Sequence, residues 1–400
     1  MIHQIKIHIL LFEFSLAWRN LTYNFKQFIV SIIAVSFAVV LMLTQIAFRE
    51  GMIESNVAFL KKLDADIILV DSERNFTSLE RTFDKYRLYQ AKSLTEIISA
   101  EPLYLTLATW KNFSNNTERI IRVFAFDIEE PVFLFQNIQN YLPNLSHENT
   151  VLADTASRNV YGPLTIGTQT ELSGQRIKVV GNFQLGSDFV ADGNILMSDE
   201  NFLRIFGSRP SGFSGDFRKT LNNVDLGLIK VQDQSSIEQV ISNLKRILPK
   251  DVAIFTKLNY VEREKNFYSE VTLGFIFKFG AITGFFIGIF ITYNIVSADI
   301  RKNMPQYATL KAIGHSQKFL LNVVLFQVIL IAILGFIPGL CLSQMLCDFI
   351  SQITGLLIPI TYQSMRLIFF ANISMCLTAG VFSAQKLNSI DPVDIYSRKF

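Results

Sequence analysis

The sequence predicts an α-helical membrane protein with four transmembrane helices (1+3) and a large mixed α+β extracytoplasmic domain between the first and second. Two observations carry this prediction. Four uncharged apolar runs reach the length of about 20 residues that a helix needs to cross the hydrocarbon core of a bilayer. One run lies near the N-terminus and three lie in the last third, so a long stretch of ordinary soluble composition separates the first from the others.

Each of the four predicted spans is flanked by charged residues. A single run of this kind is also expected of a buried core helix, but four runs in a chain with 50% hydrophobic residues favour a membrane protein. The first run is not a cleaved signal peptide, because it exceeds the roughly 7–15 apolar residues of such a peptide and no small-x-small site follows. The spans cover residues 28–48, 279–298, 319–347 and 367–385.

Basic residues near the span ends predict the orientation. They gather in the N-terminal segment 1–27, in the loop 299–318 and in the C-terminal tail 386–400. Because Lys and Arg near span ends mark the cytoplasmic side, we expect both termini and this loop inside the cell and residues 49–278 outside. Segment 1–27 mixes apolar and basic residues at helical spacing, which predicts an interfacial helix that contacts membrane lipid. The chain is expected to be a multi-pass protein of the plasma (inner) membrane.

The extracytoplasmic part is expected to begin and end with helical stalks. The first span and its stalk take residues 28–63, and the second stalk and span take 258–298, because both flanks are nearly free of helix breakers. Residues 64–257 form the domain between them. A Gly- and Ser-rich run at 207–216 predicts a division of this domain into two subdomains, about 64–206 and 217–257.

Periodicity predicts the elements of this domain. A short helix is expected at 93–100 with Ser93 as its cap, and a hairpin over 168–183 is expected to turn at Ser173 and Gly174. The end of the domain predicts a β-α-β unit with a strand at 224–231, a helix at 235–248 and a strand at 252–255. Further strands are expected at 65–71, 119–127, 150–153 and 194–197.

The sequence lacks the motifs that are typical of several classes of function. No G-x-x-x-x-G-K-[ST] phosphate-binding loop and no H-E-x-x-H zinc motif occurs, and the 3 cysteines do not have the spacing of a metal site. We therefore expect no cofactor, no metal and no enzymatic activity of this chain itself. The net charge of +3 does not indicate a nucleic-acid partner. The spans contain no Asp, Glu, Lys or Arg, which argues against an ion or proton pathway.

Two groups of residues are candidates for functional roles. Gly280, Gly284 and Gly288 recur at intervals of four in the second span, and such spacing lets helices approach closely, although glycine is also common in membrane helices. In the loop 299–318, Pro305 suits the first turn of a helix and Gly314 suits its end. Such a helix would present Tyr307, Leu310 and Lys311 as a docking surface; the alternative is a plain basic connector.

Motifs in this loop and elsewhere resemble a known family. YATLKAIG at 307–314, LAWRNL at 16–21 and IDPVD at 390–394 resemble motifs of the MacB/FtsX-type (type VII) ABC transporter permeases. More closely, the chain resembles their DevC-like subfamily from cyanobacteria. RLYQA at 87–91, WKN at 110–112 and GNFQLGSDFVADG at 181–193 carry that closer resemblance.

The resemblance implies a homodimeric permease bound to a separate cytoplasmic ABC ATPase, a periplasmic adaptor (membrane fusion) protein and a TolC-like outer-membrane channel. It implies that the permease transmits ATP-driven motion to the periplasmic domain, and that 299–318 holds the coupling helix with Tyr307, Leu310, Lys311 and Gly314 as ATPase contacts. Gln306 departs from the glutamate usual there, and Pro305 is unusual. By subfamily analogy the cargo is a glycolipid or another lipophilic envelope component.

Two alternatives belong to other classes of function. One is an FtsX-like transmembrane regulator of an envelope enzyme, in which the external domain controls a hydrolase. The other is a receptor that has no ATPase partner. Copurified proteins distinguish them, because export requires an adaptor and a channel whereas regulation requires the hydrolase.

Overall fold

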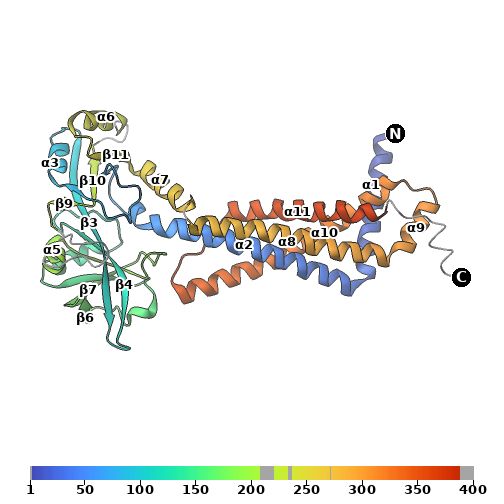
Figure 1. The fold of residues 1–400 in the computed structure, drawn as a ribbon, viewed down its shortest axis with the longest axis horizontal. Coiled ribbons are helices and arrows are strands. Elements are labelled where there is room, and N and C mark those ends of the chain that lie inside the picture. Colours follow the sequence, from blue (N-terminus) through green and yellow to red (C-terminus); the bar gives the residue numbers. More distant parts are fainter. Residues whose placement is uncertain (1, 208–219, 233–236, 271, 388–400) are drawn as a thin grey trace. The chain divides into compact units, whose positions relative to one another are not determined.

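The computed structural model describes residues 2–207, 220–232, 237–270 and 272–387, and for 2–10, 272 and 387 it describes the backbone alone. The chain divides into two compact units, whose elements are labelled in Figure 1. The helical unit comprises Met1–Glu50, Phe275–Phe349 and Ile358–Phe400. The sheet unit comprises Gly51–Gly274 and Ile350–Leu357.

Long apolar helices build the helical unit. They are α1 (Ile2–Tyr23), α2 (Phe25–Lys61), α8 (Thr272–Lys302), α9 (Met304–Ala312), α10 (Gln317–Thr354) and α11 (Tyr362–Ala384), followed by the 3-10 turn η4 (Gln385–Leu387). In the part of the chain that the structure describes, α2, α8, α10 and α11 are long and apolar enough to cross a membrane. They coincide with the four predicted spans, so the 1+3 arrangement is confirmed.

An apolar cluster joins these helices. Ala17 of α1, Ala38 of α2, Tyr307 of α9, Val323 of α10 and Met375 of α11 are all members, and each is at most 1% exposed. The described part of segment 1–27 forms α1 and the start of α2, and Ala17 brings α1 into the packing of this unit. Its position at a membrane interface stays a prediction. The predicted tail 386–400, including the IDPVD motif, lies from residue 388 onward outside the described residues.

The sheet unit is built on one nine-stranded sheet with the order β11-β1-β10-β3-β4-β8-β5-β7-β6. Neighbouring strands are antiparallel except for the β4–β8 and β5–β7 pairs. A two-stranded sheet joins β2 (Phe83–Asp84) and β9 (Asn223–Val224). The strands of the large sheet are β1 (Ile67–Asp71), β3 (Ile97–Asn112), β4 (Thr117–Phe126), β5 (Thr150–Asp154), β6 (Gln169–Leu172), β7 (Gln175–Phe183), β8 (Asn194–Ser198), β10 (Leu226–Val231) and β11 (Val252–Thr256).

Most predicted elements of this unit are present, with one correction. The hairpin turns where expected, since Ser173 and Gly174 have positive φ between β6 and β7. The helix predicted at 93–100 is wrong: α3 (Tyr86–Lys92) ends there, with Ser93 as its C-cap, and β3 begins at Ile97. Residues 97–100 form a strand although they also suit a helix, because β3 pairs with both β10 and β4. This long-range pairing overrides the short local preference for a helix.

The strands of the two predicted subdomains share this sheet. β1 lies between β10 and β11, so strands from 64–206 and from 217–257 are hydrogen-bonded neighbours. The predicted β-α-β unit is present as β10, α6 (Ile237–Ile247) and β11, with β1 inserted between its two strands. The Gly- and Ser-rich run at 207–216 lies from residue 208 onward outside the described residues.

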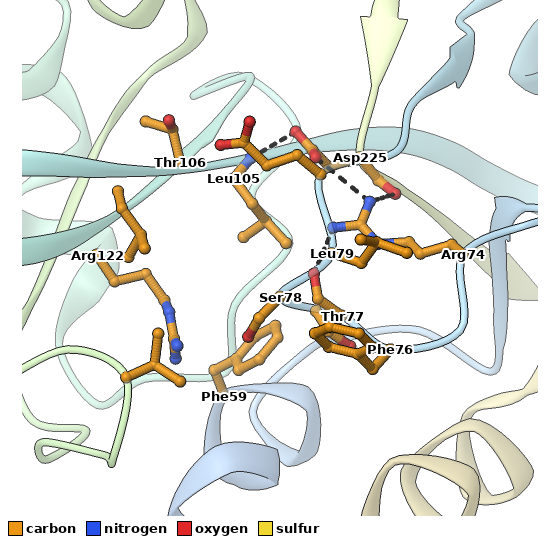
Figure 2. Close-up of a pocket in the computed structure, with 13 residues that line it drawn as sticks. Phe59, Arg74, Phe76, Thr77, Ser78, Leu79, Leu105, Thr106, Arg122 and Asp225 are labelled. Atoms are coloured by element: carbon orange, nitrogen blue, oxygen red, sulfur yellow. Dashed lines mark hydrogen bonds and ion pairs between the residues drawn. The ribbon is translucent and has the colours of Figure 1, made fainter. Parts of the chain in front are cut away.

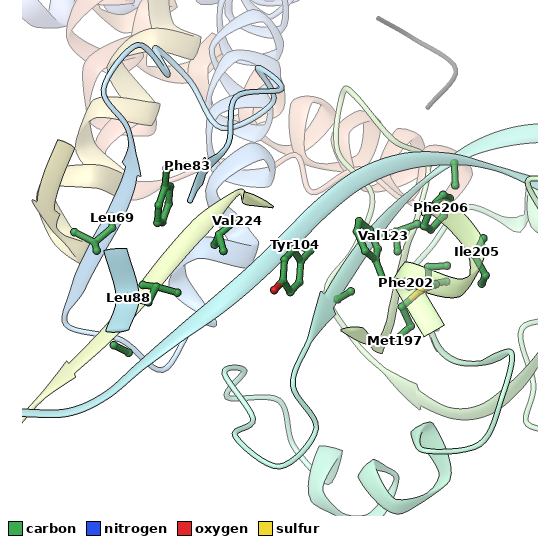
Figure 3. Packing of buried hydrophobic residues seen from close by; sticks show 14 of the residues in the cluster. Leu69, Phe83, Leu88, Tyr104, Val123, Met197, Phe202, Ile205, Phe206 and Val224 are labelled. Carbon is green, nitrogen blue, oxygen red and sulfur yellow. The ribbon is translucent and has the colours of Figure 1, made fainter. Parts of the chain in front are cut away.

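Successive side chains of a strand point to opposite faces of the sheet, so the sheet has an apolar cluster on each face. Helices cover both clusters. Tyr104 of β3 joins the cluster shown in Figure 3, together with Phe202 of α5 (Asp199–Phe206) and Leu88 of α3. Leu103 and Leu105 of β3 join the opposite cluster. The end of α2 and α7 (Lys257–Glu270) cover that second face.

The remaining short elements lie in the connections of the sheet unit. The helical turns are η1 (Ile138–Asn140), α4 (Leu142–Leu145) and η2 (Asn159–Tyr161). The segment Ile350–Leu357, which comprises the end of α10 and the start of the link to α11, also belongs to this unit. Leu356 forms a bridge with Ser187, and the Ser187 hydroxyl donates to the Thr354 carbonyl at 3.4 Å.

Candidate functional site: α9 and the glycines that pack the helical unit

The helix α9 has well-defined ends. Pro305 occupies its first turn, as predicted, where a missing N–H costs no hydrogen bond. At its other end the Gly314 N–H donates to the Lys311 carbonyl at 3.1 Å and the His315 N–H donates to the Leu310 carbonyl at 3.1 Å. This pair of bonds is a Schellman motif, which places the residue at Gly314 in the left-handed region; its φ is 103°. Gly314 therefore ends the helix.

Tyr307 faces the interior of the helical unit. Its side chain is 1% exposed and belongs to the apolar cluster of this unit, as does Ala308. Burial raises the pKa of the Tyr307 hydroxyl, although the side chains of Gln327 and Asn20 oppose that rise. Tyr307 is thus part of the core and not part of an exposed docking face, which corrects the arrangement expected from the sequence.

The exposed face of α9 is formed by other residues. Gln306 and Thr309 are exposed, and Ile313, at the C-cap, is 72% exposed. These positions are separated by three and four residues, so they share one side of a helix. Of the predicted contacts, Leu310 is half-buried against the apolar cluster and Lys311 is half-buried with a partner of its own.

Sequence reasoning missed Ile313. The signal was present, because an apolar residue placed directly before the terminating glycine shares a face with Gln306 and Thr309 if the helix extends to that point. Tyr307, Leu310 and Ile313 all lie in the YATLKAIG run at 307–314, but only the first two were predicted to face a partner. In the structure the Tyr307 and Leu310 side chains pack with the apolar cluster and hold α9 in place. Ile313 is an exposed apolar side chain at the C-terminal end of the opposite face.

The predicted glycines of α8 face α2. A Cβ on Gly280 would lie 2.8 Å from the Gln45 side chain, and one on Gly284 would lie 3.3 Å from Met42 Cγ. A Cβ on Gly288 would lie 2.9 Å from the Ala38 Cβ and closer still to the Met375 sulfur of α11. The glycine stripe therefore lies where α8 meets its neighbours, in agreement with a packing role.

Another two glycines, Gly335 and Gly339, pack α10 against α2. A Cβ on Gly335 would lie 2.7 Å from Val35 Cγ1, and one on Gly339 would lie 2.8 Å from Val39 Cβ. The Ser36 hydroxyl of α2 donates to the Gly335 carbonyl at 2.9 Å, which is possible because the backbones are so close. These two glycines were not among the predicted packing residues, although they have the same spacing of four as the glycines of α8.

Polar side chains link other helices inside this unit. Asn372 of α11 is buried and its Nδ2 donates to the Ala332 carbonyl of α10 at 2.9 Å. The hydroxyls of Ser297 and Ser383 lie 3.2 Å apart and join α8 to α11. Such interhelical hydrogen bonds fix the register of apolar helices. Within the described ranges, no three His, Cys, Asp or Glu side chains group together closely enough to hold a metal ion.

Part of the chain matches a known family. Residues 278–392 match the family model described as FtsX-like permease C-terminal. This match begins in α8 and takes in α9, α10 and α11. It therefore includes the exposed face of α9 and the paired glycines of α10, and of the sheet unit it includes only Ile350–Leu357.

Two solved structures are similar to the chain over about half of its length. One is the extracellular domain of the noncanonic ABC-type transporter YknZ from Gram-positive bacteria, with 10% identity, a TM-score of 0.33, and coverage of 48% of this chain and 99% of that one. The other is the periplasmic region of MacB from Actinobacillus actinomycetemcomitans, with 10% identity, a TM-score of 0.35, and coverage of 55% and 99%. Likenesses of this size carry no argument about function.

Proposed function

We propose that this chain, whose residues 278–392 match the FtsX-like permeases, is the membrane subunit of an ABC-type export complex. In this proposal a separate ATPase binds the exposed face of α9. Nucleotide-driven motion of that ATPase displaces α9, and the helices carry the displacement to the domain between α2 and α8. The chain itself contains no phosphate-binding loop, so the nucleotide is assigned to the partner.

The arrangement of α9 is the observation that carries this proposal. One side of α9 is fixed by Tyr307 and Ala308, which are 1% and 0% exposed in the core of the helical unit. The other side is open around Ile313. α8 ends two residues before α9 begins, and α10 begins after a short turn. Because packed interiors transmit strain rather than absorb it, a force on the open side acts on α8 and α10.

Continuity of α2 supports transmission beyond the apolar segment. α2 runs as a single helix from Phe25 to Lys61, past the end of its apolar run at Phe48. Near its end Glu54 forms ion pairs with Lys61 and with Lys265 of α7. A helix without a break moves as one body, which is the property that a mechanical stalk needs.

The remaining features of the complex follow from the same proposal. We place both termini and α9 in the cytoplasm, the sheet unit in the periplasm and the helices in the inner membrane. The working unit is a homodimer, with a periplasmic adaptor protein and a TolC-like outer-membrane channel as further partners. The DevC-like motifs favour a glycolipid or another lipophilic envelope component as cargo.

Crosslinking from Ile313 tests this function. A photoreactive amino acid at position 313 is expected to capture a protein with a phosphate-binding loop, identified by mass spectrometry of the crosslinked band. The matched control places the same amino acid at Ile98, which is 53% exposed in the sheet unit. Capture of that ATPase from both positions, or from neither, contradicts the proposal. Capture of a hydrolase at position 98 and of no ATPase at 313 favours a regulator of an envelope enzyme instead.

A further inference from the structure

The sheet unit contains a cavity of about 220 Å³ beside the middle of β3 (Figure 2). Its most buried apolar lining side chains are Phe59 near the end of α2, which is 3% exposed, and Leu105 of β3, which is 8% exposed. Leu79, Leu107 and Val190 are half-buried and also line it. The apolar part of the cavity wall therefore comes from a helix, a strand and two loops, and polar side chains such as Arg74, Thr106 and Asp225 form the rest.

The buried charges around the cavity are already compensated. Arg122 forms an ion pair with Asp188, and its guanidinium lies 5.9 Å from the centre of the Phe59 ring. Arg74 pairs with Asp225 at 3.3 Å, and both side chains are 2% exposed. Since buried ions in pairs have little attraction left for a further charge, the cavity is suited to an apolar group.

The rim of the cavity is polar. Ser78 and Glu80 line it and are exposed, and the Ser78 hydroxyl lies 3.1 Å from that of Tyr268. The loop that carries Ser78 and Glu80 is held in place by a buried residue of α7. The Thr77 N–H donates to the Glu264 carboxylate at 2.9 Å, and Glu264 is fully buried. A ligand with an apolar part inside the cavity and a polar part at this rim would satisfy both environments.

The size of the cavity limits what it can hold. Its volume of about 220 Å³ exceeds the ~150 Å³ at which an engineered apolar cavity binds benzene. This space accepts a segment of a single alkyl chain and not an entire lipid. An alkyl chain is also flexible enough to follow a wall made from a strand and two loops.

We propose that this cavity binds the alkyl chain of an amphipathic molecule, with the polar headgroup at the rim formed by Ser78 and Glu80. The chain contacts Phe59, Leu105, Leu107 and Val190. The cavity recognises the chain rather than the charge of the headgroup. This inference does not depend on an ATPase partner. It can fail while the proposed function stands, and the proposed function can fail while this inference stands.

Occupancy of the cavity is connected to the segment after α10. Val190 lines the cavity, and its N–H donates to Asp188 at 2.7 Å, so the Arg122–Asp188 pair shapes the loop that carries it. Ser187 in the same loop forms the bridge with Leu356. A chain that presses on Val190 therefore acts on a loop that also contacts the link between α10 and α11.

Photolabelling tests the proposal on the full chain in phosphatidylcholine nanodiscs. A diazirine-bearing dodecanoic acid added from solution is one probe, and a nanodisc phospholipid with a diazirine in its acyl chain is the other. We expect labelled peptides to contain residues 76–80, 105–107 or 190 in at least one arm. Labelling by the phospholipid identifies membrane lipid as the source, and labelling by the free acid alone identifies a soluble amphiphile. Labelling of neither kind within these peptides overturns the proposal.

Variants and competitors make the test specific. Leu107→Trp and Val190→Trp fill the cavity from two different walls, and each is expected to lower labelling by about tenfold or more, which corresponds to roughly 1.4 kcal/mol. Leu134→Trp is the matched control, because Leu134 is 57% exposed and does not line the cavity. Unlabelled dodecanol and dodecanoic acid are expected to reduce photolabelling of the cavity equally, and butyrate is expected to have no effect on it.

Hydrogen exchange supplies a second readout that does not depend on labelling. Dodecanol is expected to slow amide exchange over residues 185–191 in the wild-type chain and in Leu134→Trp, but not in Leu107→Trp. Folding of each variant is checked by limited proteolysis. Unchanged labelling in both cavity variants, or competition by butyrate as strong as by dodecanol, contradicts an alkyl-chain site.

Discussion

Replacing Arg74 by alanine is expected to destabilise the sheet unit by about 3–5 kcal/mol, the cost of removing one partner from a buried ion pair. Arg74 Nη1 donates to the Asp225 carbonyl at 2.7 Å and to the Arg81 carbonyl at 2.6 Å, besides pairing with the Asp225 carboxylate. Its Nη2 donates to the Thr77 carbonyl. The alanine variant removes the donor from these carbonyls and leaves the buried Asp225 charge without its cationic partner, with only the Leu105 N–H still donating to it at 2.9 Å.

The matched control for this variant is Arg81→Ala. Arg81 pairs with Glu73 at 3.1 Å, but the two side chains are 52% and 71% exposed, so the loss is expected to stay below about 1 kcal/mol. The chain has 2 tryptophans, Trp18 and Trp110, and the second is 1% exposed in the sheet unit. Urea unfolding followed by Trp110 fluorescence in a Trp18→Phe background reports this unit. Equal midpoints for the two arginine variants would show that the buried pair has no special role.

Replacing Gly339 by alanine is expected to destabilise the helical unit by about 1–3 kcal/mol through overpacking. The added Cβ would lie 2.8 Å from Val39 Cβ, 2.9 Å from Val39 Cγ1 and 3.0 Å from the Ser36 carbonyl oxygen. A β-branched side chain and a backbone atom cannot move aside without separating α10 from α2. The Ser36 hydrogen bond to Gly335 would lengthen at the same time.

Gly284→Ala is the matched control in a neighbouring helix. Its Cβ would lie 3.3 Å from the flexible Met42 side chain, and alanine favours a helix over glycine by roughly 1 kcal/mol, so little net change is expected. Cys347 and Cys376 are buried in α10 and α11, which makes thermal unfolding with a thiol-reactive dye, in a Cys341→Ser background, specific to this unit. A Gly339→Ala chain as stable as Gly284→Ala would contradict the packing assigned to α10.

The helical unit was predictable because its signal is local. An apolar run long enough to cross a bilayer is visible without knowledge of any partner, and the four spans lie where the sequence predicts them. Pro305 and Gly314 likewise mark the ends of α9 through their own backbone preferences. The burial of Tyr307 was not predictable, because it depends on which side of α9 meets α10 and α1.

The sheet unit was predictable in part. Strands with continuous apolar runs, such as β1 and β4, were found. β3 was missed, because residues 93–100 also suit a helix and no strand was predicted over 101–112. The strand order could not be derived, since β1 pairs with β10 across more than half of the domain's sequence. Arg74 and Asp225, which are 151 residues apart, give no sign in the sequence of their contact. The cavity beside β3 depends on that contact and was missed for the same reason.

ATP hydrolysis that copurifies with the chain tests the central claim most directly. We expect Ile313→Asp to lower the copurified activity by about tenfold or more, as for the loss of a central interface residue, and Ile98→Asp to leave it unchanged. Tyr307→Phe keeps the buried ring and should also leave it unchanged. An Ile313→Asp chain that retains full activity, or a chain that hydrolyses ATP after its partners have been removed, would contradict an ATPase acting through the open face of α9.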